Sequence, residues 1–361
     1  MKIAPEFSEQ VARAKNDLRM GMPVVLRGGE SVVATALETA SPERLREFVE
    51  FGEPLAIALT ERRANTLKAR AYDGDIARIR VPRGASPEWF YSVADPSLDL
   101  QNPMKGPFLS ERGGDASVYR AAVELARRSR LLPAVLILKV SDPTGFASAH
   151  GLLCLELPNM RSLARLSSVR QVVNARLPLE GADSSRIRIF RPNEGSEEHG
   201  VLEFGEPRRS EPVLARIHSA CFTGDVLGSL KCDCGQQLRA ALAKIRDEKK
   251  GVLLYLNQEG RGIGLSNKIR AYSLQDQGFD TVDANHRLGF EDDERDFRLG
   301  SEILRQLGFS SVRLMTNNPA KAAMMKEFGI KVAEMIPIKA PANPFNAEYL
   351  ATKARKSGHV F

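Results

Sequence analysis

Cysteines and aromatic residues are scarce in this chain of 361 residues, which has four cysteines, one tryptophan and 6% aromatic residues. No apolar run is long enough to span a bilayer, so we expect no membrane segment. The N-terminal stretch MKIAPEFSEQVARAK carries early acidic residues and no continuous apolar core, which excludes a typical secretory signal. These absences predict a cytoplasmic protein, and in a reducing compartment clustered cysteines are more often metal ligands or catalytic thiols than disulfides.

Length and charge set two further limits. The chain is long enough for two domains of ordinary size, and its 43% hydrophobic and 27% charged residues are typical of a globular protein. A formal net charge of +7 suits an anionic partner such as a nucleotide or a nucleic acid. Basic patches interleaved with aromatic residues, which a single-strand-binding surface needs, are missing. We therefore expect no nucleic acid partner.

The N-terminal part alternates helical and extended patterns up to about residue 140. SPERLREFVEFG predicts a helix with Ser41 as its N-cap and Pro42 as its first residue, and a second helix is expected to stop at Gly21. LAIALT and PAVLILKV predict buried strands. This patterning indicates an α/β or α+β fold.

A change of composition separates the two halves. Residues 162–200 are rich in Arg, Ser, Glu and Gly, and we place a domain boundary near their start, giving domains 1–165 and 166–361. From Val213 onward short strands alternate with helices, among them a helix expected to end at Gly251 and another at Gly278.

Three of the four cysteines fall in the stretch CFTGDVLGSLKCDCGQQL, as Cys221, Cys232 and Cys234. Three thiolates suit a divalent ion of borderline softness, and zinc is the expected one. A set of three protein ligands leaves one position for water or substrate, which is the pattern of a catalytic site. Two alternatives stay open: His218 closes a structural site as a fourth ligand, or the thiols pack as small hydrophobic groups.

Two polar loops follow predicted strands. NQEGRGIG contains glycines that allow backbone to approach a ligand, and Glu259 and Arg261 can pair with a polar ring edge or a phosphate. TNNPAKAA places Asn318 and Pro319 at a helix start with Lys321 in the first turn, which makes an anion site. A plain turn and a well-capped helix with a solvated lysine are the alternatives.

Between these loops lie the polar stretches DTVDANHRLGF and EDDERDF. Such an acidic run most often forms the solvated first turn of a helix, which is the alternative interpretation. Asp293 and Arg295, however, place opposite charges two residues apart, which supports acid–base work and phosphate pairing. Together with a three-thiolate metal site, these stretches predict hydrolysis of a nucleotide.

The combination of ARIHSACFTGDVLGSLKCDCGQQL, YLNQEGRGIGLSNKIRAYSLQDQGFDT, ANHRLGF, DERDF and RLMTNNPAK resembles GTP cyclohydrolase II of riboflavin biosynthesis. The resemblance covers residues 170–360, in the order of the family's motifs. It implies opening of the imidazole ring of GTP, with release of formate and pyrophosphate and formation of 2,5-diamino-6-ribosylamino-4(3H)-pyrimidinone 5′-phosphate. It also implies one Zn²⁺ per subunit, Mg²⁺ accompanying the triphosphate, and a homodimer.

Residue roles follow from the same resemblance. It assigns zinc to Cys221, Cys232 and Cys234, the proton acceptor to Asp293, and the formate-releasing hydrolysis to Tyr272. Arg295 is implied as the nucleophile that takes the nucleotidyl group, whereas its permanently protonated guanidinium favours stabilisation of phosphate charge. The implied GTP contacts are Arg216, Ile217, His218, Ser219, Ala220, Gln237, Glu259, Gly260, Arg261, Thr281, Thr316 and Lys321.

One position departs from the family pattern, because the segment RIHSA has Ala220 where many members have glutamate. The change removes neither a zinc ligand nor a proposed catalytic residue. It leaves room for a cyclohydrolase-like enzyme that acts on another nucleotide or pyrimidine. A nucleic-acid-binding module with a structural zinc is the remaining alternative.

The N-terminal domain resembles 3,4-dihydroxy-2-butanone 4-phosphate synthase in its framework but not in its chemistry. An acidic DRENEGD-type loop is replaced by LRGGESVVAT, in which Glu30 is the only acid, and RAGHTEA is replaced by RGGDASVYRA. Lys139 stands where a glutamate is expected. With so few carboxylates a hard divalent cation lacks oxygen ligands. We therefore expect this domain to be inactive as a synthase.

Overall fold

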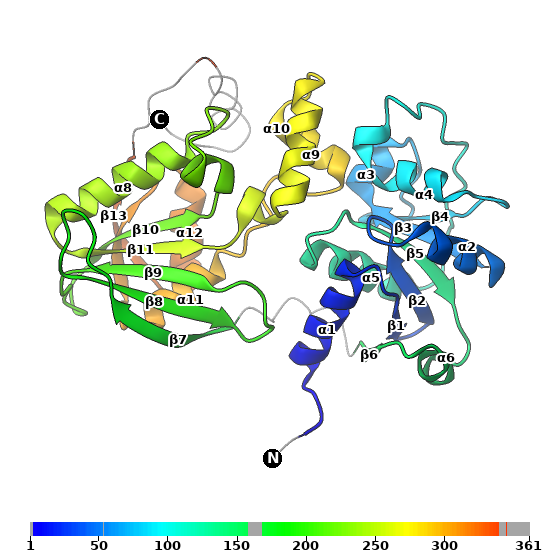
Figure 1. Cartoon of the computed structure of the whole chain (residues 1–361), viewed down its shortest axis with the longest axis horizontal. Helices are drawn as coiled ribbons and strands as arrows, with labels where there is room; N and C mark the ends of the chain where they lie inside the picture. Colours follow the sequence, from blue (N-terminus) through cyan, green and yellow to red (C-terminus); the bar gives the residue numbers. More distant parts are fainter. Residues whose placement is uncertain (1–2, 53, 158–167, 339–343, 345–361) are drawn as a thin grey trace. The chain divides into compact units, whose positions relative to one another are not determined.

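The computed structural model describes residues 3–52, 54–157, 168–338 and 344 (Figure 1). The chain forms two compact units. The first contains the N-terminal residues together with Ser266–Asp293, and the second contains residues 167–265 and the chain from Glu294 onward. The predicted boundary between residues 165 and 166 lies outside the described residues.

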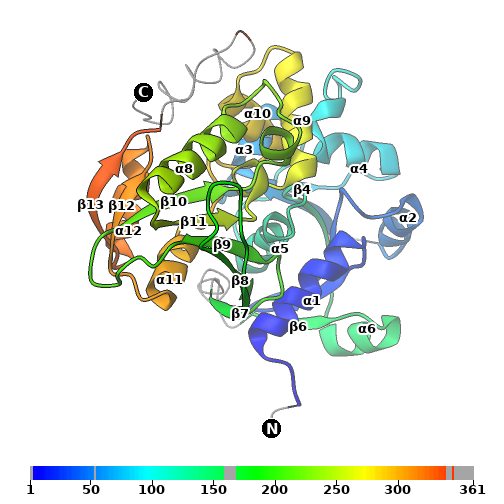
Figure 2. The same ribbon diagram turned by 60° about the vertical axis from the view of Figure 1, so that its left-hand side comes forward.

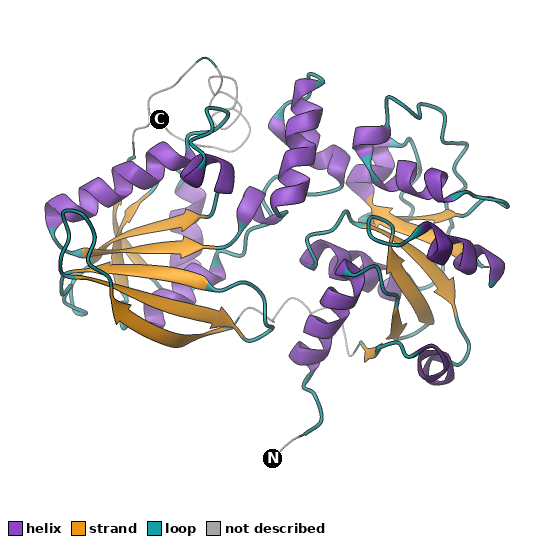
Figure 3. Cartoon of the chain, viewed as in Figure 1, coloured by secondary structure: helices purple, strands orange, loops and turns teal. Residues whose placement is uncertain are grey.

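The first unit has a six-stranded mixed sheet in the order β4-β3-β5-β2-β1-β6, antiparallel except for the β1–β6 pair (Figure 3). Its strands are β1 (Val24–Arg27), β2 (Ser31–Ala36), β3 (Leu55–Thr60), β4 (Ile76–Arg80), β5 (Ala134–Lys139) and β6 (Cys154–Glu156). Its helices are α1 (Phe7–Arg19), α2 (Pro42–Glu50), α3 (Glu61–Thr66), α4 (Pro87–Ala94), η1 (Pro96–Leu98), α5 (Ser117–Arg128), α6 (Pro143–His150), α9 (Leu265–Asp276) and α10 (Thr281–Leu288).

Both faces of this sheet are covered. Alternate residues of the strands pack against α1 and α5 on one face, and the residues between them pack against α2, α4 and α6 on the other. The predicted cap of α2 is confirmed, since Ser41 Oγ accepts a hydrogen bond from the Arg44 amide and Pro42 is the first helical residue. Gly21, with φ of 75°, follows the end of α1 as predicted.

The C-terminal part contributes two helices to this first unit, which the sequence did not predict. Thr60 Oγ1 donates to the Gly289 carbonyl oxygen at 2.8 Å, and Arg270 pairs with Glu38 and Asp95 at 2.8 and 3.0 Å. Gly289 has φ of 90°, and a Cβ there would lie 2.8 Å from the Thr60 hydroxyl. Residues 266–293 are therefore held by specific contacts to the N-terminal residues.

The second unit has a seven-stranded sheet in the order β13-β12-β10-β11-β9-β8-β7. Its strands are β7 (Val169–Arg176), β8 (Ser185–Pro192), β9 (His199–Phe204), β10 (Val213–Ser219), β11 (Gly251–Leu256), β12 (Ser311–Met315) and β13 (Lys331–Ile336). Its helical segments are η2 (Phe222–Val226), α8 (Cys234–Glu248), η3 (Glu259–Gly262), α11 (Arg298–Gln306) and α12 (Pro319–Glu327). The four strands from β13 to β11 are parallel, and β9, β8 and β7 continue the sheet antiparallel.

Helices cover both faces of the parallel part of the second sheet (Figure 2). Ala241 and Ile245 of α8 pack against Leu214 and Leu253 on one face, and α11 and α12 pack on the other. The described residues of both units thus form α/β layers, as the sequence predicted. At the carboxyl ends of β10, β11 and β12 lie the loops that contain the predicted site residues, which is where ligands bind in open α/β sheets.

One prediction for the second unit is wrong in detail. Helix α8 does not extend to Gly251, because Lys249 adopts the left-handed conformation at its C-cap and Gly251 is already the first residue of β11. The Arg-rich segment near whose start the boundary was placed forms strands from Val169 onward, although no strands were predicted there. In the first unit, the polar stretch after Asp280 forms helix α10, whose N-cap Asp280 accepts from the Val282 and Asp283 amides.

Candidate metal centre and surrounding site

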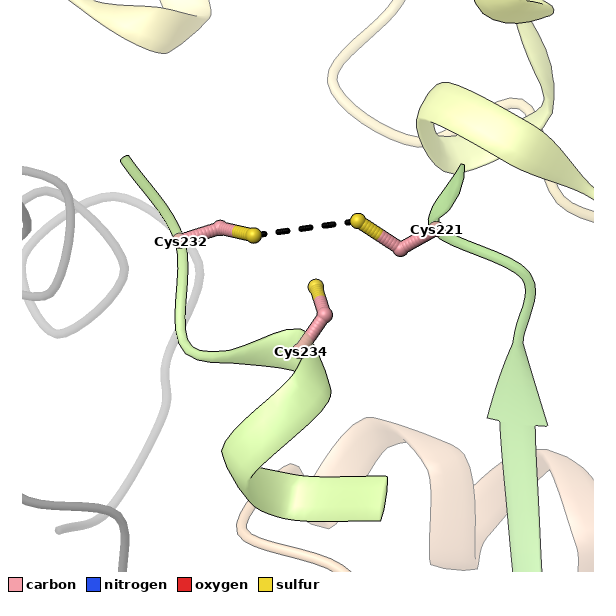
Figure 4. Close-up of side chains that lie close together, drawn as sticks. All are labelled: Cys221, Cys232 and Cys234. Carbon is pink, nitrogen blue, oxygen red and sulfur yellow. Dashed lines mark hydrogen bonds between the residues drawn. The ribbon is translucent and has the colours of Figure 1, made fainter. Parts of the chain in front are cut away.

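Three cysteines converge at one end of the second unit's sheet (Figure 4). Cys221 follows β10, Cys232 lies in the loop before α8, and Cys234 is the first residue of α8. Their sulfur atoms all lie within 4.8 Å of one another, and the Sγ atoms of Cys221 and Cys232 are 3.7 Å apart. This distance is far too long for a disulfide, whose sulfurs are separated by about 2.05 Å.

The cluster has the dimensions of a tetrahedral zinc site. With zinc–sulfur distances of about 2.3 Å, two thiolates of a tetrahedral site are about 3.8 Å apart, close to the 3.7 Å that separates two of these sulfurs. The loop leaves room for them only because residue 224 is glycine: a Cβ there would lie 2.8 Å from Cys232 Sγ and 3.0 Å from Cys221 Sγ. The three sulfurs converge, and Gly224 places no side chain among them, so the cluster has room for a zinc ion.

The chemistry of the thiols points the same way. The neighbouring Cys221 thiol, followed by Cys232 and burial, holds the pKa of Cys234 well above its usual range. The same neighbour raises the pKa of Cys232. Without a cation the Cys232 and Cys234 thiols therefore stay protonated at neutral pH, and a bound divalent ion is what makes three adjacent thiolates stable.

His218 does not complete this cluster. Its imidazole is buried on β10, and its Nε2 lies 3.0 Å from the Asp225 carboxylate rather than at the sulfurs. Among the described residues, the group that can hold a metal consists of the three cysteines alone. Burial lowers the pKa of His218 in spite of the neighbouring Asp225, so the imidazole is neutral at physiological pH. The open fourth position favours the catalytic type of site over the structural type.

Cationic side chains gather beside the thiol cluster. Arg216 is buried, donates to the Met315 carbonyl oxygen and to Gln237 Oε1, and its pKa is lowered by burial to about 10, so it stays charged at neutral pH. Arg295 donates to Ser219 Oγ at 3.3 Å. Arg295 and Lys321 both lie over the ring of Phe297, at 4.9 and 5.4 Å from its centroid. This concentration of positive charge suits a polyanionic ligand.

The loop NQEGRGIG is fixed against both the metal loop and the segment with Arg295. Glu259 Oε2 accepts a hydrogen bond from the Phe222 amide at 2.6 Å. The Glu294 amide donates to the Arg261 carbonyl oxygen at 2.9 Å, and a Cβ at Gly262 would lie 2.7 Å from the Glu294 backbone. Gly260 and Arg261 both adopt positive φ, of 62° and 59°. The loop is thus tightly folded and not a simple turn.

The remaining predicted residues divide between the two units. Gln237 lies in the first turns of α8, the Ala220 amide donates to the Leu256 carbonyl oxygen, and Thr316 is buried after β12. Ile217 is buried on β10. The predicted cap of α12 is confirmed, because Asn318 Oδ1 accepts from the Ala320 amide and Pro319 is the first helical residue.

Three predicted residues belong to the first unit instead. Tyr272 lies on α9 beneath the Lys268 ammonium, 5.7 Å from the ring centroid. Thr281 begins α10 and accepts a hydrogen bond from Gln275 Nε2 at 3.0 Å, and Asp293 is exposed at the end of this unit. The structure therefore brings the three cysteines together with the cationic residues and the glycine loop, and it places these three residues in the first unit.

Two residues that the sequence analysis did not single out lie beside the thiol cluster. Asp225 is in η2, and Tyr255 is the one polar side chain in the apolar strand GVLLYL. The Tyr255 hydroxyl donates to Asp225 Oδ2 at 2.9 Å. A tyrosine in an otherwise apolar buried strand needs a partner for its hydroxyl, and that signal was available in the sequence.

Comparisons with known proteins agree with this site. The family model for GTP cyclohydrolase II matches residues 170–337. GTP cyclohydrolase-2 of Azospirillum brasilense is 44% identical over 97% of this chain and 94% of its own length. The riboflavin biosynthesis protein RibBA of Aquifex aeolicus is 35% identical over 97% of both chains. GTP cyclohydrolase-2 of Baumannia cicadellinicola is 53% identical over 53% of this chain and 96% of its own.

These matches extend over both units. The relative from Azospirillum brasilense covers nearly the whole chain at an identity far above chance, and the family model covers the segments that contain the thiol cluster and the loops around it. The chain belongs to the GTP cyclohydrolase II family.

Proposed function

We propose that this protein hydrolyses GTP to 2,5-diamino-6-ribosylamino-4(3H)-pyrimidinone 5′-phosphate, formate and pyrophosphate, the first step of riboflavin biosynthesis. The observation that carries this proposal is the group of three buried or half-buried thiols with no fourth protein ligand among the described residues. Membership of the family and the cationic surroundings of the cluster support the same reaction.

Cys221, Cys232 and Cys234 would hold one zinc ion. When bound, zinc acidifies a coordinated water toward neutrality, so that hydrolysis can proceed at C8 of the guanine ring and then at the formyl group. Gly224 keeps the space between the sulfurs free of a side chain, and Glu259 ties the loop after Cys221 to the glycine loop.

The ligand roles are assigned by resemblance and by charge. Glu259 would accept from the guanine edge, while Arg261 and Lys321 would pair with phosphates. Arg216 would add a buried positive charge, since its guanidinium is already oriented by Met315 and Gln237. The same resemblance adds contacts from Ile217, His218, Ser219, Ala220, Gly260, Thr281 and Thr316. Mg²⁺ would accompany the triphosphate.

Asp293 would accept the proton from the attacking water, and Tyr272 would assist the release of formate. Arg295 donates to Ser219 beside the thiol cluster, a location that suits stabilisation of charge on the transferred phosphoryl group as well as capture of the nucleotidyl group. We further propose a homodimer in the cytoplasm, where the thiols stay reduced.

The N-terminal domain would have no synthase activity. Lys139 pairs with Glu30 at 3.0 Å, so the only acid of the replaced loop is neutralised by an ammonium group. This ion pair raises the pKa of Lys139, which therefore stays charged at neutral pH. A positive charge at this point opposes the binding of a divalent cation, and the synthase-like reaction depends on one.

One assay tests the proposed reaction. Zinc-loaded full-length protein is incubated with GTP and Mg²⁺, and formate and pyrophosphate are quantified. We expect equimolar release of both products. Pyrophosphate without formate would indicate a truncated reaction, and release from another purine nucleotide but not from GTP would favour the alternative substrate that Ala220 suggests. Neither product from any nucleotide would contradict the proposal.

A further inference from the structure

The carboxylate of Asp225 is the meeting point of a buried hydrogen-bond network next to the thiol cluster. Its side chain and that of His218 are each only 3% exposed. It accepts from His218 Nε2 at 3.0 and 3.1 Å, from the Tyr255 hydroxyl at 2.9 Å and from the Cys221 amide at 3.0 Å. A buried carboxylate is stable only when its oxygens are paired in this way.

The donors come from two segments, β10 with the residues that follow it and the neighbouring strand β11. His218 is on β10, Cys221 is the second residue beyond the end of this strand, and Tyr255 is on the neighbouring strand β11, where it pairs in register with His218. The His218 and Tyr255 rings are stacked, with centroids 5.6 Å apart. Asp225 therefore connects the loop after Cys221 to two adjacent strands of the rigid sheet.

The same loop lies against the sulfurs. The Gly224 and Asp225 amides both donate to the Cys221 carbonyl oxygen, at 3.0 and 2.7 Å. A Cβ at Gly224 would lie within 3.0 Å of two of the sulfurs, so the backbone next to Asp225 forms one wall of the cluster. A shift of Asp225 would move this wall and the Cys221 backbone together.

We propose that Asp225 is a positioning residue for the metal site, and that Tyr255 acts through it. By holding Cys221 and the Gly224 backbone onto β10 and β11, the Asp225 carboxylate sets the separation of the sulfurs before any ion binds. The proposal rests on the metal site of the proposed function. Groups behind the ligands orient them, and their loss typically lowers metal affinity about 10- to 100-fold.

The test compares metal affinity in full-length variants by competition of Zn²⁺ with a chromophoric chelator, and by the visible spectrum of the Co²⁺-loaded protein. Asp225→Asn replaces one acceptor oxygen of the carboxylate with an NH₂ group, which cannot accept a hydrogen bond from His218, Tyr255 or the Cys221 amide. We expect its zinc affinity to fall about 10- to 100-fold, and its Co²⁺ absorption bands to shift or weaken. Tyr255→Phe removes one of the donors, and we expect a smaller loss, about 3- to 10-fold.

Glu203→Gln is the matched control. Glu203 is a buried residue on β9 of the same unit, and its carboxylate pairs with Arg188 and Arg209. On the neighbouring strand β11 it lies opposite Val252 rather than Tyr255. We expect this variant to lower the melting temperature but to keep wild-type zinc affinity. Equal zinc affinity in Asp225→Asn and wild type, or the same loss in Glu203→Gln, would overturn the proposal.

Two further results allow the positioning role of Asp225 to be judged independently of folding and of the proposed reaction. If Asp225→Asn does not fold, Tyr255→Phe decides, and wild-type zinc affinity and Co²⁺ spectrum in that variant would contradict the proposal. If wild-type protein binds zinc but releases no formate from GTP, the proposed function fails while the affinity comparison still measures the role of Asp225.

Discussion

At the scale of single residues, the site depends on sulfur atoms that the chain brings together from three positions. The sulfur atoms of Cys221, Cys232 and Cys234 all lie within 4.8 Å of one another, an arrangement that fits a metal site. Cys154 provides an internal comparison, since it is a free cysteine on β6 of the first unit, and burial raises its pKa.

Replacement of one ligand should abolish the reaction and preserve the fold. In Cys232→Ser we expect zinc content to fall well below one per chain and formate release to drop at least about 100-fold, the upper range for loss of a group behind a ligand. Circular dichroism should stay unchanged, because the cluster lies at the end of the sheet and outside its core. Cys154→Ser should keep both zinc and activity. Global unfolding of Cys232→Ser would instead indicate a structural metal.

A methyl group at Gly224 should have a related but smaller effect. The added Cβ would lie 2.8 Å from Cys232 Sγ and 3.0 Å from Cys221 Sγ, so the sulfurs must move apart. We expect Gly224→Ala to weaken zinc binding about 10-fold, measured by chelator competition. Gly200→Ala is the control, because a Cβ at Gly200 meets no atom within 4 Å. Equal zinc affinity in the two variants would show that the cluster tolerates the methyl group.

At the scale of helices and strands, hydrophobic pattern and capping residues predicted many of the elements in both units. Ser41 and Asn318 cap their helices as expected. The end of α8 was misplaced because glycine is the usual residue in the left-handed conformation, whereas Lys249 adopts it here with φ of 57°. Helix α10 was missed because its first turn is as polar as a loop, and only Asp280 signals its start.

The strained cap of α8 gives a prediction of increased stability. A non-glycine residue in the left-handed region costs about 1–2 kcal/mol, so Lys249→Gly should stabilise the second unit by about 1 kcal/mol. Hydrogen exchange of the α8 amides measures this change, and protection should increase. Lys250→Gly is the control, since residue 250 is outside the set with positive φ and only flexibility is gained. Slower exchange in both variants would contradict the explanation.

At the scale of the whole molecule, family and fold class were predictable from motifs, but the assignment of Ser266–Asp293 to the first unit was not. The contacts that hold it, such as Arg62 with Glu291 and Arg270 with Glu38, join residues more than 200 positions apart. Pairing of this kind leaves no periodic signal. Asp225 was missed for a similar reason, since the donors to its carboxylate include Tyr255 on a separate strand, 30 positions away.

A buried ion pair stabilises the first unit, and this contribution to the free energy of unfolding is lost in acid. Arg63 is 1% exposed and pairs with Asp99 at 2.8 Å, and Lys105 also contacts Asp99. Burial raises the pKa of Asp99, but the hydrogen bonds and charges of Arg63 and Lys105 outweigh it, so the pKa lies below its usual value of 3.8. The stabilisation is therefore present above about pH 4 and is lost as the pH falls further through the pKa of the folded state.

Asp99→Ala should remove this stabilisation at neutral pH. The buried Arg63 guanidinium then loses its charge partner, which costs about 3–5 kcal/mol. Trp89, the only tryptophan of the chain, lies on α4 of this unit, so urea unfolding followed by its fluorescence reports the change. A midpoint equal to that of the wild type would show that the pair contributes nothing.

Zinc titration of the metal-stripped full-length protein, with formate release from GTP as the readout, tests directly whether the three thiols hold a catalytic ion. We expect no formate without metal, a rise in proportion to added zinc, and saturation at one zinc per chain. Formate release that persists without zinc, or that needs more than one zinc per chain, would contradict the claim that three cysteine thiolates hold the catalytic ion.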